Sequence, residues 1–201
     1  PAIMDRIQYL QQAQEGIRSS DNRQFALTVM LFSAFVEHIS LFSQFLIIMA
    51  FNKHRAAFKG VSNIVEATSK EEQIHGMFGV ELVRILQHEY PEWFDAETED
   101  TILKAVERAY AAEQHILDWI FERGELDYLP RHQVDEFLKN RFNNSLRSVG
   151  VEPLFSVDEQ ALAATRWFDE ELLATKENDF FNKRSITYSK KMKSFSEAEL
   201  F

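Results

Sequence analysis

The chain has 201 residues and a formal net charge of −10, which argues against nucleic acid or an anionic membrane surface as its main partner. It contains no cysteine, which excludes disulfides and thiolate metal sites and fits a reducing cytoplasm. Apolar residues make up 45% of the chain, and the 6 glycines and 4 prolines are few for a turn-rich β protein, so the composition predicts long helices around one core.

Apolar spacing along the chain predicts an all-α fold. The first amphipathic helix carries Ile3, Ile7, Leu10 and Ile17 and ends near residues 19–22. A second helix is expected over Phe25 to Phe51, followed by a basic link that closes at Gly60. Further helices are expected at 61–88, 97–123, 131–149 and 158–165.

The segment from Phe25 to Phe51 is apolar on nearly all sides. Its length would suffice for a transmembrane helix, but it would also suit the central helix of a soluble bundle. Glu37 lies at its middle. Because an acid at the centre of a bilayer costs about 2.5–3.5 kcal/mol, we favour the buried helix and expect no membrane span.

Glu37 and the motif Glu72-x-x-His75 are the candidate metal ligands. Residues three apart share a helix face, and a buried carboxylate such as Glu37 needs a cation or a proton. Alone, Glu72 and His75 could be a solvated pair, and Glu37 could be a protonated core acid or an interface residue. Together they favour a metal held between two helices, and carboxylates with one imidazole suit iron or manganese, although zinc fits the same ligand types.

The remaining histidines and two further acids are interpreted as structural. His38 is adjacent to Glu37 and therefore points elsewhere on its helix, so packing is favoured over ligation. The others are expected at the surface, at the edge of the core or, for the acids, in solvated or structural positions: His54, His88, His115, His132, Glu107 and Glu113.

Several stretches together resemble the C-terminal half of the small (β) subunit of class I ribonucleotide reductase. In the central one, Lys70–Glu71–Glu72–Gln73–Ile74–His75 is similar to an Arg-Asp-Glu-x-x-His motif with two conservative changes. The other stretches are 76–79, 90–93, 126–130, 140–143, 167–171 and 178–184.

The resemblance implies a ferritin-like helical bundle with a dinuclear iron, manganese or mixed iron–manganese site. In that family the site makes an oxidant, usually a tyrosyl radical, which the large subunit uses to reduce ribonucleotides. Glu37, Glu72 and His75 would then be metal ligands. Glu71 occupies a position where the family often has an aspartate that hydrogen-bonds in the radical pathway.

The chain departs from the family because the ligands and radical tyrosine of the family's first half are absent. Tyr9 is on the first helix but has no Glu-x-x-His upstream. We therefore predict the C-terminal fragment of a split small subunit, which needs an N-terminal small-subunit chain for its remaining ligands. As an enzyme it would be a ribonucleoside-diphosphate reductase small subunit, active only with that chain and the large subunit, and the assembled small subunit is expected to dimerise.

Two domains are expected, a helical bundle over residues 1–168 and a flexible tail over 169–201. In the family a tail tyrosine relays the radical and the last residues dock on the large subunit, which implies these roles for Tyr188 and for residues 190–201. Two alternatives stay open. One is a ferritin-like metal oxidase assembled by homodimerisation, and the other is a non-catalytic remnant that only binds the large subunit.

Overall fold

A computed structural model describes residues 2–15 and 20–173, and within these ranges the chain is helical without a β-strand. An isolated bridge pairs Leu126 with Leu129. The elements are α1 (Ala2–Glu15), α2 (Asn22–Leu31), the π-helix η2 (Phe32–Ser40), α3 (Phe42–Arg55), α4 (Lys59–Glu89), the 3₁₀ turn η3 (Pro91–Trp93), α5 (Ala96–Phe121), α6 (Arg131–Ser148), α7 (Glu159–Ala163) and α8 (Arg166–Leu173). The predicted all-α class is confirmed.

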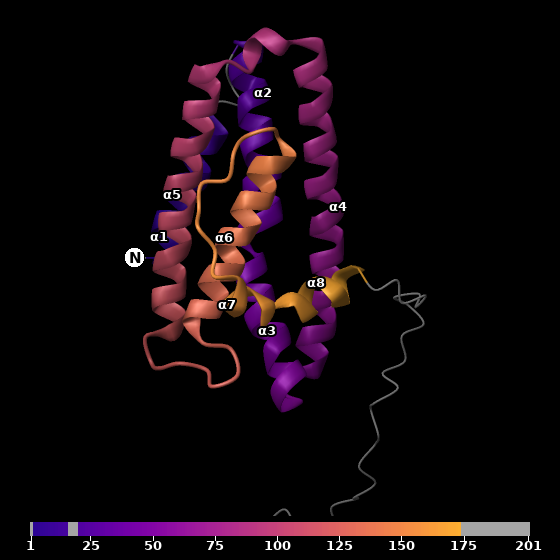
Figure 1. The fold of residues 1–201 in the computed structure, drawn as a ribbon, viewed down its shortest axis with the longest axis vertical. Helices are drawn as coiled ribbons and strands as arrows, with labels where there is room; N and C mark the ends of the chain where they lie inside the picture. Colours follow the sequence, from indigo (N-terminus) through magenta and orange to yellow (C-terminus); the bar gives the residue numbers. More distant parts are fainter. Residues whose placement is uncertain (1, 16–19, 174–201) are drawn as a thin grey trace, which may run out of the picture.

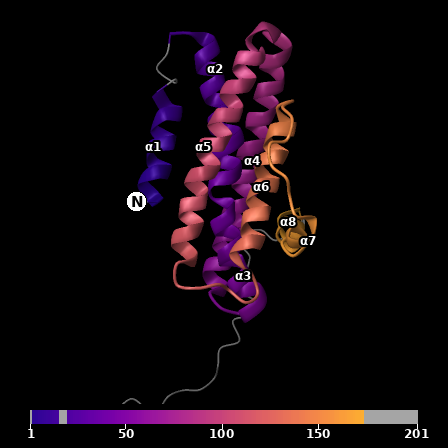
Figure 2. The same ribbon diagram turned by 60° about the vertical axis from the view of Figure 1, so that its left-hand side comes forward.

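The long helices form a bundle (Figure 1). Segments α2, η2 and α3 follow one another along its length, and α4 returns beside them and packs on both η2 and α3. Helix α6 contacts α3, α5 and η2, while α1 packs along α5 at one edge (Figure 2). The short helices α7 and α8 lie across the lower end in Figure 1.

The single helix predicted over Phe25–Phe51 is wrong, because the structure divides that segment into three parts. Helix α2 ends at Leu31, a π-helix of 9 residues follows, and α3 begins at Phe42 after a break at Leu41. A segment that is apolar on nearly every side gives no periodic signal for this change of winding. Within the described residues, no helix combines the length and apolar character that a membrane span requires.

The turn between α3 and α4 also differs from the prediction. Gly60 does not close the link, because α4 already begins at Lys59. The reversal instead uses left-handed backbone at Ala56 and Phe58, each with φ 53°. Such φ values are uncommon for residues with a side chain and are usually found at glycine. Because neither residue is a glycine, the sequence did not indicate where the backbone reverses. The other long helices agree with the predicted ranges to within two residues at their ends.

Phenylalanines dominate the core. The largest fully buried side chains include Phe35, Phe42, Phe137, Phe142 and Phe168.

Helix α8 is anchored on this core and crosses the boundary expected at residues 168 and 169. Leu172 is buried, and Arg141 donates to Asp169 at 3.2 Å. The Arg141 guanidinium lies 3.9 Å from the ring centroid of Phe42, and burial lowers its pKa to about 10. The expected tail from residue 174 onward lies outside the described residues.

Candidate metal centre

Glu72 and His75 lie side by side on one turn of α4. Glu72 Oε2 is 3.4 Å from His75 Nδ1, as expected for residues three apart on a helix. Two donors that each bind one ion at about 2.1 Å are separated by roughly 3–3.5 Å, so this pair fits two neighbouring ligands of one metal ion. The side chain of Glu72 is 23% exposed and that of His75 is 59% exposed. The pair is therefore open to a group that approaches from outside the chain.

Glu37 lies on η2, which packs against α4. Its side chain and that of His38 fall outside the described residues, so the structure does not test whether Glu37 joins the pair. Among the described side chains, no group of three or more acids and histidines could hold a metal ion. The three-ligand set of Glu37, Glu72 and His75 therefore stays a prediction.

The functional roles expected for Glu71, Tyr188 and residues 190–201 also stay predictions. Glu71 is exposed on α4, next to Glu72. Tyr188 and the expected docking segment 190–201 lie outside the described residues.

Six large apolar side chains of α4 are exposed within the part of the chain that the structure describes, and we call this set the outer α4 face. The members of this face are Val61, Ile64, Ile74, Met77, Phe78 and Ile85. Ile64, Phe78 and Ile85 fall on a spacing of seven or fourteen residues, which is typical of a helix seam. Phe78, three residues beyond His75, is 71% exposed. Exposed apolar side chains of this size are candidates for an interaction surface.

A buried ion pair that the sequence did not single out joins α1 to α5. Glu113 is 1% exposed and accepts hydrogen bonds from Arg6, including one from Nε at 2.9 Å. Arg6 Nη2 also donates to the Ser40 carbonyl at 2.8 Å and to Gln44 Oε1 at 3.0 Å. Burial raises the pKa of the Glu113 carboxyl, and the nearby Arg6 guanidinium opposes that rise.

Of the two roles expected for Glu113, solvated or structural, the structural one is found. The signal for it was present in the sequence, because Glu113 continues the apolar stripe of Ile102, Val106, Ala109, Ile116 and Ile120. An acid at a core position of a helix needs a partner.

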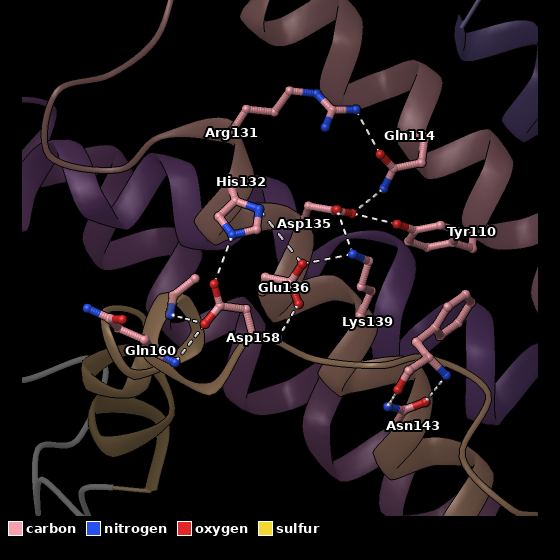
Figure 3. A network of polar contacts seen from close by, with 12 residues as sticks. Tyr110, Gln114, Arg131, His132, Asp135, Glu136, Lys139, Asn143, Asp158 and Gln160 are labelled. Atoms are coloured by element: carbon pink, nitrogen blue, oxygen red, sulfur yellow. Dashed lines mark hydrogen bonds and ion pairs between the residues drawn. The ribbon is translucent and has the colours of Figure 1, made fainter.

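A second buried polar group connects α5, α6 and the loop before α7 (Figure 3). We call it the α5–α6 network, and it contains Tyr110, Gln114, Arg131, His132, Asp135, Glu136, Lys139, Asn143 and Asp158. Asp135 accepts from Tyr110 at 2.7 Å and from Gln114 at 2.5 Å. Glu136 accepts from Lys139 and from the backbone N–H of Asp158, both at 2.8 Å.

His132 lies at the rim of this network, with its side chain 60% exposed. Its Nε2 is 3.2 Å from Asp158 Oδ2, and its Nδ1 is 3.8 Å from buried Glu136. The surface position predicted for His132 agrees with this exposure, but the buried acid four residues further along the helix was overlooked. The carboxylates of the α5–α6 network already have partners in the protein, so we place the candidate metal centre at Glu72 and His75 instead.

The chain is similar to a known protein family and to several curated proteins. A family model described as "Ribonucleotide reductase, small chain" matches residues 1–161. The chain is 28% identical to the probable ribonucleoside-diphosphate reductase small subunit 048L of Invertebrate iridescent virus 3, over 83% of this chain and 44% of that protein. It is 23% identical to the ribonucleoside-diphosphate reductase subunit beta of Chlamydia pneumoniae, over 86% of this chain and 49% of that protein. The chain thus spans about half the length of these two relatives.

Proposed function

This chain belongs to the ribonucleotide reductase small-chain family, and we propose that it forms the C-terminal half of a metal-bearing small subunit that serves the reduction of ribonucleotides. The observation that carries the proposal is the Glu72–His75 pair, whose donor atoms lie 3.4 Å apart on a half-exposed helix face. The two relatives support it, since both are named as ribonucleoside-diphosphate reductase small or beta subunits.

The site would hold iron or manganese ions through Glu37, Glu72 and His75, with the remaining ligands from another chain. When bound, a dinuclear centre of this kind supplies the oxidising chemistry. The residues of this chain bind and orient the ions. Glu72 provides carboxylate oxygens, and His75 must be unprotonated at Nδ1 to bind, so metal affinity should fall in acid. Phe35 of η2 stacks on Phe142 of α6 in the core, and this apolar packing would keep water from one side of the centre.

An N-terminal small-subunit chain would complete the site by packing on the outer α4 face. Its large apolar side chains are exposed, and Phe78 follows His75 by three residues on the same helix, so a helix placed on it would bring its own side chains next to the ligand pair. A second copy of this chain is the alternative occupant, and it corresponds to the homodimeric metal oxidase.

The large subunit is the other proposed partner, bound through residues 190–201. Tyr188 would relay the radical to it, and Glu71 would take part in that pathway through a hydrogen bond. These roles rest on the resemblance to the family alone. The proposal that the assembled small subunit dimerises has the same basis.

Metal binding and native mass together test the proposal. The chain is titrated with Fe²⁺ or Mn²⁺ without oxygen, alone and with an N-terminal half of a small subunit. We expect full dinuclear loading only in the mixture and its loss in Glu72→Ala and His75→Ala. The matched controls are Glu81→Ala and His88→Ala, which change the same residue types at exposed positions of α4.

Four outcomes would contradict parts of the proposal. Two metal ions in the isolated monomer would exclude a site shared between chains. Two ions in a dimer of this chain would favour the homodimeric oxidase. Unchanged metal loading in both Glu72→Ala and His75→Ala would refute the assignment of these residues as metal ligands. If those variants were active in a reconstituted enzyme, only the non-catalytic role of binding the large subunit would remain.

A further inference from the structure

The guanidinium of Arg6 lies where three segments of the bundle meet. Arg6 comes from α1, Glu113 from α5, and Ser40 and Gln44 from the chain that runs from η2 into α3. Nε and Nη2 of Arg6 bond the two carboxylate oxygens of Glu113, which hold the guanidinium in one orientation. Nη2 also bonds the Ser40 carbonyl at 2.8 Å and Gln44 Oε1 at 3.0 Å.

Ser40 is the last residue of the π-helix, so the contact from Arg6 falls on the end of that segment. π-helices are rare, usually last a single turn and occur often at functional sites. This one has 9 residues, and Leu41 separates it from the α-helical winding that resumes at Phe42. The π-helical conformation of such a segment competes with the α-helical one, and contacts at the end of the segment can stabilise one conformation over the other. Glu37 lies three residues before Ser40, on the same segment.

We propose that Arg6 and Glu113 are positioning residues, which hold the end of the π-helix and thereby fix the backbone that carries Glu37. The inference rests on the proposed metal centre for its functional consequence, because Glu37 is a ligand only under that proposal. Glu113 acts on Arg6, and Arg6 acts on Ser40 and Gln44. A lysine at position 6 would keep the charge but lose the forked geometry that reaches a carboxylate and a carbonyl together.

The alternative is a purely structural role, in which Arg6 only holds α1 against the rest of the bundle. Arg23 offers a matched control, because it is also an arginine that ties two helices. Arg23 Nη2 donates to Asp95 at 2.6 Å and to Thr98 at 2.8 Å, which joins α2 to the start of α5. Arg23 lies at the opposite end of α2 from the π-helix and makes no contact with Ser40 among its hydrogen bonds.

Hydrogen exchange of the metal-free full chain tests the anchoring itself. In Arg6→Met and Glu113→Gln, amides of residues 32–41 should exchange about tenfold faster or more, while amides of residues 134–146 in α6 keep their rates. Arg6→Lys should give an intermediate increase, and Arg23→Met should leave 32–41 unchanged. If the amides of residues 32–41 were equally protected from exchange in Arg6→Met and Arg23→Met, the proposal would be overturned. If Arg6→Met does not fold, Arg6→Lys and Glu113→Gln carry the same comparison.

Metal affinity then tests the connection to Glu37. Arg6→Met should weaken the affinity of the assembled small subunit for Mn²⁺ roughly tenfold, which is the usual effect of changing a residue that supports the metal ligands. In a Glu37→Gln background, Arg6→Met should cause little further loss of Mn²⁺ affinity, because the effects of residues that act through the same group are not additive. A full tenfold effect of Arg6→Met without Glu37 would contradict positioning through Glu37. If no metal binds at all, the proposed function fails while the exchange result still decides the anchoring.

Discussion

The outer α4 face and the α5–α6 network combine polar and apolar side chains in opposite ways. In the network, buried acids such as Asp135 and Glu136 have donors from α5, α6 and the following loop. On α4, Glu72 and His75 contact each other at 3.4 Å, and the same helix exposes large apolar side chains such as Ile74 and Phe78. The first arrangement is complete within this chain, and the second leaves apolar side chains and a polar pair partly exposed.

This difference gives a physical criterion for separating structural from functional polar groups. A buried carboxylate with satisfied hydrogen bonds contributes to one folded state and costs several kcal/mol when its partners are removed. A partly exposed ligand pair contributes little to the free energy of unfolding, so it can be changed without loss of the fold. Mutations with the same chemistry in the two regions should therefore have different effects on stability.

The largest effect is expected for Glu136→Ala. The change removes the acceptor for the backbone N–H of Asp158 and one of the two acids that pair with Lys139, which keeps Asp135 at 3.1 Å. We expect the free energy of unfolding to fall by about 3 kcal/mol, as measured by urea denaturation at pH 7. Glu71→Ala makes the same substitution at an exposed position of α4 and should change it by less than about 0.5 kcal/mol. Equal losses in both variants would contradict the distinction between the regions.

A smaller loss is expected for Asn143→Ala, which affects the loop before α7. Asn143 Oδ1 accepts from the N–H groups of Leu154 and Phe155, and Nδ2 donates to the Phe155 carbonyl at 2.8 Å. Because Asn143 is buried, these backbone groups lose their partners together. We expect a loss of about 2 kcal/mol in the free energy of unfolding.

Hydrogen exchange locates that loss. In Asn143→Ala the amides of residues 154 and 155 should exchange faster than in the parent chain, while those of α5 are unchanged. The control Asn144→Ala changes the neighbouring exposed asparagine, whose side chain accepts from Arg147 at 2.8 Å. An equal increase in the two variants would mean that the loop is held by other contacts.

On the outer α4 face, Phe78→Ser should leave the isolated chain almost unchanged in stability. The side chain is 71% exposed, so its removal takes away little packing, and the expected change is within about 0.5 kcal/mol. The same variant should weaken assembly with an N-terminal small-subunit chain, as measured by native mass spectrometry over a concentration series. Loss of stability without loss of assembly would show that Phe78 packs within this chain instead.

Most of the fold could be predicted from the sequence, because long helices leave strong apolar periodicity. The ranges expected for α5 and α6 agree closely with the structure. The π-helix was not predictable, because a segment that is apolar on nearly every side has no alternation of apolar and polar residues from which the number of residues per turn could be inferred. The link between α3 and α4 was predicted, but its left-handed backbone at Ala56 and Phe58 was not, since the turn uses no glycine or proline.

The candidate site was predictable only where its residues are close in sequence. Glu72 and His75 are three apart, and the structure brings their donor atoms together. The contact of Arg6 with Glu113 spans 107 residues and has no local pattern, although an acid within an apolar stripe was a signal. Glu37 cannot be judged in the same way, because its side chain lies outside the described residues.

The smallest effect is expected at the exposed rim of the α5–α6 network, where Asp158 caps α7. The backbone N–H of Ala161 and the side chain of His132 hold the pKa of the Asp158 carboxyl below its usual range. Since the folded state binds the proton less tightly than the unfolded state, this carboxylate stabilises the fold above about pH 4, and the contribution is lost as the pH falls further. Asp158→Asn keeps a good capping residue and should match the parent chain at pH 7.

The expected signature of Asp158→Asn is a shallower fall of the urea midpoint between about pH 4 and pH 2. Asp95→Asn should behave alike, because Asp95 caps α5 and the N–H of Thr98 lowers the pKa of its carboxyl. A steeper fall in acid for either variant would reverse the assigned sign. If instead Asp158→Asn loses as much stability at pH 7 as Glu136→Ala, the rim belongs to the buried part of the network, and exposure is not what limits its contribution.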